Sequence, residues 1–72
     1  MYYVRNITRK AVLCYRDGGR IAYASAEAAA PHAEFANQST GDLHDVVSLA
    51  TGPFFPLNCI IAPWIQRYPG TV

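Results

Sequence analysis

Few residues in this chain are of the types that do acid–base or nucleophilic chemistry. The candidates are two histidines, His32 and His44, two cysteines and five carboxylates. A cysteine with a histidine, or His44 beside Asp45, can in principle form a nucleophile and its base. Adjacent residues on a helix do not face each other, however, and no local motif gathers these groups. We therefore predict a protein without catalytic residues, which is not an enzyme.

The same residues give no metal or cofactor motif. The histidines and acids lack the spacings that zinc and calcium sites use, and Gly18-Gly19 is too short to cradle a phosphate. Cys14 and Cys59 are far apart in the sequence, which excludes a C-x-x-C redox motif, and free cysteines often behave as small buried hydrophobes. We predict no metal, no cofactor and two buried thiols.

Positive charge is concentrated at the start of the chain. The net charge is +1, yet the first 20 residues hold five of the six basic residues and only one acid. The five are Arg5, Arg9, Lys10, Arg16 and Arg20. Because side chains alternate along a strand, Tyr3 and Arg5 point the same way, so bases and tyrosines can share an exposed sheet face. Such a face suits a phosphate backbone or an acidic protein surface; the alternative is an ordinary sheet face with partly buried tyrosines.

The C-terminal segment offers a second candidate contact surface. Trp, Tyr and Arg are the residue types that anchor protein interfaces, which nominates Trp64, Arg67 and Tyr68 as partner-binding residues. The alternative is that Trp64 and Phe55 belong to the core.

Three strands are expected to position the basic residues. Residues 2–7 and 11–15 are rich in aromatic and β-branched side chains, and the Asp17-Gly18 turn precedes a third β-compatible run over 20–24. We predict an N-terminal three-stranded antiparallel meander. Its first strand, residues 2–7, is a candidate edge that a partner strand can extend.

One or two short helices are expected to cover the meander. Ser25 can cap a helix over 26–38 that is kinked at Pro31, or Pro31 can begin a shorter helix. The small residues that would let this helix lie close to the sheet are Ala28, Ala29, Ala33 and Ala36.

The spacing of apolar residues over 42–50 predicts a second helix, although Val46-Val47 leaves a strand open. A short extended run over 57–61 and a helical turn begun by Pro63 follow.

The overall prediction is a single α+β domain over 1–72. Hydrophobic residues make up 51% of the chain and charged residues 15%, which excludes a disordered chain. No apolar run is long enough to cross a bilayer, and the N-terminus has no secretory pattern. We expect a monomer in the cytoplasm, without membrane contact.

The layout resembles a known group of proteins. A basic hairpin (YYVRNITRKAVLCYRDGGRIAY), an alanine-rich helix (SAEAAAPHAEFANQ) and an aromatic tail are similar to the small bacteriophage proteins that bind a host machine, especially the transcription regulators that bind bacterial RNA polymerase. The resemblance implies docking through a strand or hairpin, interference with the initiation factor, and basic residues near emerging RNA that alter termination. The alternatives are a direct RNA- or DNA-binding protein and an inhibitor of a bacterial defence complex.

Overall fold

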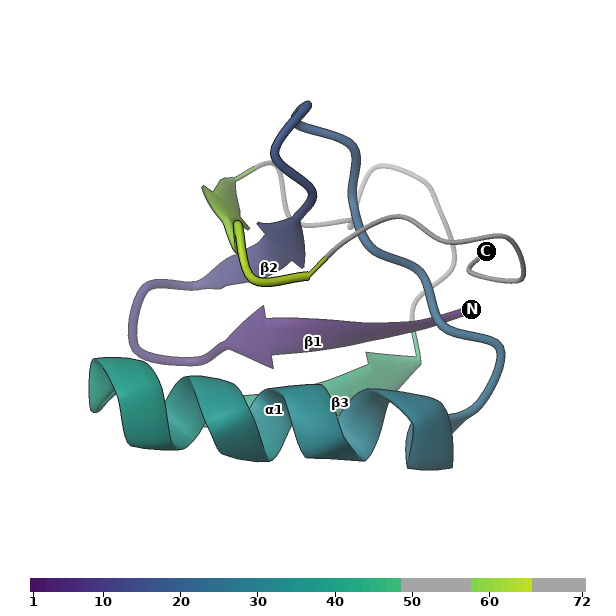
Figure 1. The fold of residues 1–72 in the computed structure, drawn as a ribbon. Coiled ribbons are helices and arrows are strands. Elements are labelled where there is room, and N and C mark those ends of the chain that lie inside the picture. The colour runs from purple at the N-terminus through teal and green to yellow at the C-terminus, as the bar shows by residue number, and fades with distance from the viewer. Residues whose placement is uncertain (49–57, 66–72) are drawn as a thin grey trace.

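The computed structural model describes residues 1–48 and 58–65, and their elements follow in the order ββαββ. Strand β1 spans Tyr2–Asn6, β2 Ala11–Cys14, helix α1 Ala26–Thr40, β3 His44–Ser48 and β4 Cys59–Ile61. The strands form one four-stranded mixed sheet in the order β3-β1-β2-β4. The predicted α+β class is confirmed in this coarse form, one helix with a four-stranded sheet (Figure 1).

The first hairpin forms where the sequence predicts it. β1 and β2 are antiparallel, with Arg5 opposite Val12. The turn between them is closed by the Asn6 side chain, whose Oδ1 accepts the backbone N–H of Arg9 at 2.9 Å. Lys10 takes a left-handed conformation, with φ of 55°, before the chain enters β2.

The predicted meander is wrong. The chain does turn where Asp17-Gly18 predicts, since Gly18 has φ of 90° and donates its N–H to Tyr15 O. Residues 20–24, however, contribute only isolated bridges, which join Arg20 to Cys14 and Tyr23 to Tyr2. The positions along the two hairpin strands are taken by later segments of the chain.

The strands beside the hairpin also decide whether β1 is an edge of the sheet. β3 pairs antiparallel with β1 along all five of its residues, and β4 pairs parallel with β2. β1 therefore lies inside the sheet, and the hypothesis that residues 2–7 form an extendable edge is wrong. β3 and β4 are the edge strands.

Helix α1 is continuous through Pro31, which decides between the two predicted alternatives. Ser25 Oγ accepts the N–H of Ala28 at 3.2 Å and caps the helix, and Gly41, with φ of 78°, ends it in the left-handed conformation. Of the four alanines expected at the sheet, the buried ones are Ala29, Ala33 and Ala36, whereas Ala28 is exposed.

The predicted second helix over 42–50 is wrong, and the strand alternative holds for its described part. Residues His44–Ser48 form β3. Val46 packs against the core beneath α1, whereas Val47 packs with Tyr3 and Val12 on the other face of the sheet. Gly41 ends α1, and the pairing with β1 then imposes a period of two on the valines.

Part of the predicted C-terminal pattern lies within the described residues. β4 covers Cys59–Ile61, inside the extended run expected over 57–61. A turn follows at Pro63, closed by the Ile65 N–H, which donates to Ala62 O at 3.0 Å.

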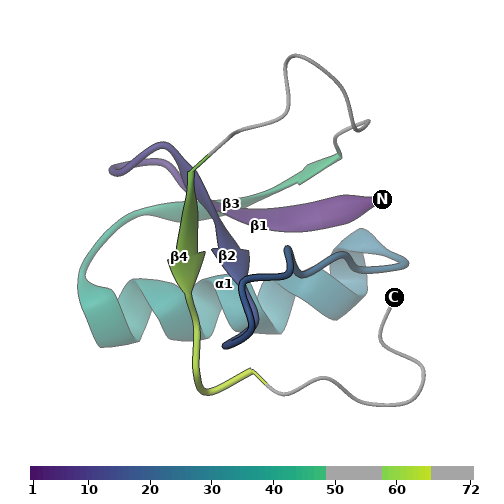
Figure 2. The ribbon, with the colours of Figure 1, turned by 90° about the horizontal axis from the view of Figure 1, so that it is seen from above.

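The molecule has two layers, with α1 on one face of the sheet (Figures 1 and 2). The main core lies between the layers; it contains Leu13, Ile21, Tyr23 and the three buried alanines of α1. α1 packs against β1 and β3. Among the described residues, no helix has the length and apolar character needed to cross a bilayer.

Candidate binding surface

The structure distributes the predicted basic residues over both ends of β2. Arg9 and Lys10 lie in the turn before the strand, and Arg16 and Arg20 lie in the loop after it. Arg5 is on β1, where its guanidinium forms two hydrogen bonds with the Asp45 carboxylate, at 2.7 and 3.1 Å. The five bases therefore do not form one continuous patch on the hairpin.

Two of the candidate bases are paired with acids. Besides the Arg5–Asp45 pair, Arg9 Nε lies 3.2 Å from Asp42 Oδ2. Lys10 and Arg16 are exposed and form no ion pair with the described residues. Arg9 also presents positive charge to solvent, because its side chain remains 67% exposed.

The aromatic residues that were predicted to contact a partner differ in their exposure to solvent. Tyr3 is buried, in agreement with the alternative that the tyrosines of this sheet face are covered. Trp64 is exposed, at 38% of its surface, and also packs against Phe35 and His32. Arg67, Tyr68 and Phe55 lie outside the described residues.

The two cysteines lie near each other on adjacent strands. In the β2–β4 register Cys59 is opposite Val12, which puts it on the same face as Cys14, two residues away. Cys14 is buried as predicted, but Cys59 is exposed, so that prediction is wrong for Cys59. Burial, and then the neighbouring Cys59 thiol, raise the pKa of Cys14 to about 12. Cys14 is therefore a protonated thiol and a poor nucleophile at neutral pH.

Aromatic rings from three segments meet beside α1. Trp64 contacts Phe35 with ring centroids 4.6 Å apart and contacts His32 edge-on at 5.5 Å. The Tyr23 hydroxyl and His32 Nδ1 form a hydrogen bond. Burial lowers the pKa of His32 and raises the pKa of Tyr23, so both groups are neutral at pH 7.

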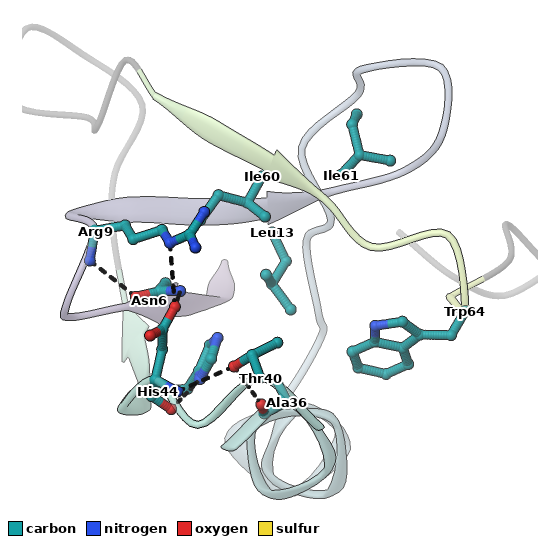
Figure 3. Close-up of a pocket in the computed structure, with 10 residues that line it drawn as sticks. Asn6, Arg9, Leu13, Ala36, Thr40, His44, Ile60, Ile61 and Trp64 are labelled. Atoms are coloured by element: carbon teal, nitrogen blue, oxygen red, sulfur yellow. Dashed lines mark hydrogen bonds and ion pairs between the residues drawn. The ribbon is translucent and has the colours of Figure 1, made fainter. Parts of the chain in front are cut away.

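This aromatic cluster borders a cavity of about 110 Å³. Its floor is the sheet, at Leu13 and Ile60, and its wall is α1, at Ala36 and Thr40 (Figure 3). The cavity lies over β2 and β4, whereas α1 packs on β1 and β3. Trp64 and the polar group around His44 stand on opposite sides of it (Figure 3).

The polar side of the cavity is held by hydrogen bonds between distant segments. Asn37 Oδ1 accepts from the His44 backbone N–H at 2.6 Å and lies 3.0 Å from His44 Nδ1. The carbonyl oxygen of Asp42 also lies 3.0 Å from Nδ1, so this nitrogen carries the hydrogen. The Asp42 carboxylate accepts from Asn6 Nδ2 at 3.0 Å. These bonds fix the imidazole and the carboxylate at the cavity edge.

Two aromatic side chains remain exposed beside the cavity. Phe35 is 50% exposed and Trp64 38%, and we call these two residues the apolar lip. Ile61 is 44% exposed, but it pairs with Cys14, and its side chain points to the other face of the sheet, away from the cavity (Figure 3). Trp64 was nominated from its residue type, but Phe35 was not. Nothing in the local sequence indicates that α1 and the turn after β4 meet here, because only the tertiary fold joins them.

The described residues show no metal-binding arrangement. Across 1–48 and 58–65, no group of three or more His, Cys, Asp or Glu side chains is placed to hold an ion. Comparisons of the chain with family models, curated proteins and solved structures found no match. The described residues thus place an apolar lip beside a small cavity, with the Arg9 cation at the cavity edge.

Proposed function

We propose that this chain is a non-enzymatic regulator that acts by binding a larger macromolecular machine in stoichiometric amounts. The observation that carries this proposal is the apolar lip of Phe35 and Trp64, whose exposed rings contact each other. Solvent-exposed aromatic side chains grouped beside a cavity are typical of protein interfaces, where Trp in particular supplies much of the binding energy.

Bacterial RNA polymerase is the partner to test first. The resemblance of the chain to small bacteriophage regulators motivates this choice, and it implies inhibition of initiation, altered termination, or both, in the cytoplasm of a bacterial host. The cations at the two ends of β2 support a secondary contact with RNA, because Lys10 and Arg16 are exposed.

Direct binding of free RNA or DNA is supported less well than binding of a protein. Arg5 and Arg9 are both engaged by carboxylates, which reduces their net attraction for phosphates. The exposed cations Lys10 and Arg16 lie at opposite ends of β2 and would give weak binding that falls steeply with salt.

The test is a reconstituted complex. Purified chain is mixed with bacterial RNA polymerase, with and without its initiation factor, and the products are separated by size-exclusion chromatography and assayed in transcription reactions. We expect co-elution and a change in initiation or termination. Trp64→Ala should weaken the complex, whereas Leu43→Ala, which removes an exposed apolar residue outside the lip, should not.

Two results would redirect or reject the proposal. Absence of co-elution together with unchanged transcription rejects the polymerase as partner. Tight binding to free RNA that disappears at high salt favours the nucleic-acid alternative. A defence complex as target is tested in the same format, with that complex in place of polymerase.

A further inference from the structure

The inference concerns the cavity between α1 and the β2–β4 half of the sheet, and it rests on the proposed binding function. We propose that this cavity is an anchor pocket for one branched apolar side chain of a protein partner, and that the anchor is flanked by acidic residues. It deepens the proposed function by naming the chemistry of the segment that is bound.

The size of the cavity favours a single side chain. Small-molecule pockets usually measure roughly 300 Å³ or more, and this cavity holds about 110 Å³. An apolar cavity of about 150 Å³ accommodates a benzene-sized group. The space here therefore matches a leucine-sized group and excludes most free metabolites.

The side of the cavity next to Trp64 favours an apolar occupant that enters from the lip. Leu13, Ile60 and Ala36 line that side with Trp64, and polar residues line the opposite side, around His44. Because the lip is exposed, a partner that inserts one side chain also covers the indole and the neighbouring Phe35 ring. Anchors of this kind, desolvated in a pocket and surrounded by weaker contacts, dominate interface energetics.

Charge complementarity favours acidic residues beside the anchor. Arg9 lines the cavity with its side chain 67% exposed, and the exposed Lys10 follows it in the same turn. The one carboxylate among the lining residues, Asp42, is occupied by Arg9 and Asn6. Arg9, Lys10 and Asp42 together carry a net charge of +1, so this edge is positive.

The remaining acids of the helix do not offset that charge. Helical geometry turns each residue by 100°, which puts Glu27 and Glu34 about half a turn around α1 from Ala36. Both glutamates are exposed on the side of the helix away from the cavity wall. A partner segment with Asp or Glu on either side of its anchor thus meets cations and avoids acids.

The experiment uses the full chain and short peptides with blocked ends. The probe is Glu-Glu-Leu-Glu-Glu; its controls are Glu-Glu-Ala-Glu-Glu, which lacks the anchor, and Lys-Lys-Leu-Lys-Lys, which reverses the charge. Trp64 is the only tryptophan of the chain and lines the cavity, so its fluorescence reports occupancy directly. We expect saturable binding of the leucine peptide in the millimolar range or tighter.

The control peptides and variants should separate the contribution of the leucine anchor from that of the flanking acidic residues. Replacing the leucine by alanine removes three buried carbon groups and should weaken binding on the order of 30-fold. Arg9→Gln should weaken binding of the acidic peptide about threefold. Its matched control, Arg16→Gln, removes an equal charge at the other end of β2 and should leave the affinity unchanged.

A cavity-filling variant tests the location. Ala36→Val adds two methyl groups at the wall and should abolish the fluorescence change, or at least reduce affinity tenfold, as expected when bulk blocks a pocket. Ala30→Val places the same substitution at an exposed helix position and should have no effect on binding. If Ala36→Val does not fold, the peptide series and the arginine pair still decide the question.

Several outcomes would overturn the inference. The first is the absence of saturable binding at millimolar peptide, which would show that the cavity is only a water-filled notch. The others are equal affinity for the leucine and alanine peptides, tighter binding of the lysine peptide, and full binding by a folded Ala36→Val variant. None of these results touches the polymerase complex, which is assayed separately. Loss of the anchor pocket and loss of the proposed function are therefore distinguishable.

Discussion

Asn37 joins the end of α1 to the start of β3, and its replacement by alanine is the sharpest test of how the candidate site is held. Its Oδ1 accepts two hydrogen bonds from His44, one from the backbone N–H at 2.6 Å and one from Nδ1 at 3.0 Å. His44 is buried, so its backbone N–H would lose its partner in a place with little access to water, whereas Nδ1 keeps the Asp42 carbonyl oxygen at 3.0 Å.

The expected cost follows from the backbone donor. A buried N–H left without its partner costs about 2 kcal/mol, and alanine recovers about 0.6 kcal/mol because it is the better helix former. Asn37→Ala should therefore destabilise the protein by about 1.5 kcal/mol. In a domain of this size that corresponds to a fall in Tm of roughly 10 °C.

Urea and thermal unfolding followed by circular dichroism measure this loss. Gln38→Ala is the matched control, because Gln38 is the next residue of α1 and is exposed; its effect should stay within about 0.5 kcal/mol. Asn37→Asp keeps the acceptor oxygen and should recover most of the loss, less a small penalty for negative charge near the helix C-terminus. Equal stability of Asn37→Ala and Gln38→Ala would refute the conclusion that this amide fixes β3 and the cavity edge.

Three further outcomes are expected. Burial lowers the folded-state pKa of His32, so its neutral form stabilises the fold at pH above about 6.5, and this contribution should be lost as the pH falls through the lowered pKa. His32→Gln should flatten the curve of stability against pH in this range. An unchanged curve would contradict the lowered pKa of His32. Gly41→Ala should cost about 1 kcal/mol from backbone strain alone, since a Cβ there meets nothing within 4 Å; Gly41→Asn should cost less in the same unfolding assay. Iodoacetamide should modify exposed Cys59 in the native protein and buried Cys14 only after unfolding, as mass spectrometry would show; rapid native labelling of Cys14 would be inconsistent with its burial.

The elements with local determinants could be predicted from the sequence. The β1–β2 hairpin and the cap at Ser25 depend on residues within a few positions of one another, and both are observed. β3 depends on a distant partner. Its valines fit a helical and an extended spacing equally well over so short a segment, and pairing with β1 decides between them.

The candidate binding surface was less predictable from the sequence, because it also depends on contacts between segments that are distant in the chain. Arg5 and Arg9 carry charge in the sequence, but their carboxylate partners, Asp45 and Asp42, lie on the far side of α1 in the chain. Residue type alone nominates Trp64, whereas the cavity at its side needs the parallel pairing of β4 with β2. Local patterns contain no information on that pairing.

The alanine face of α1 explains why an open site falls where it does. Ala29, Ala33 and Ala36 are small enough for the helix to lie close to the sheet, but one helix covers only about two strands, and it packs on β1 and β3. The apolar residues of β2 and β4 on the same face must then be covered by other groups. Larger side chains at the alanine positions would move α1 outward and open the main core, whereas the present arrangement keeps that core closed and leaves the cavity open beside Trp64. The small residues of α1 thus account both for the close helix and for the cavity beside it.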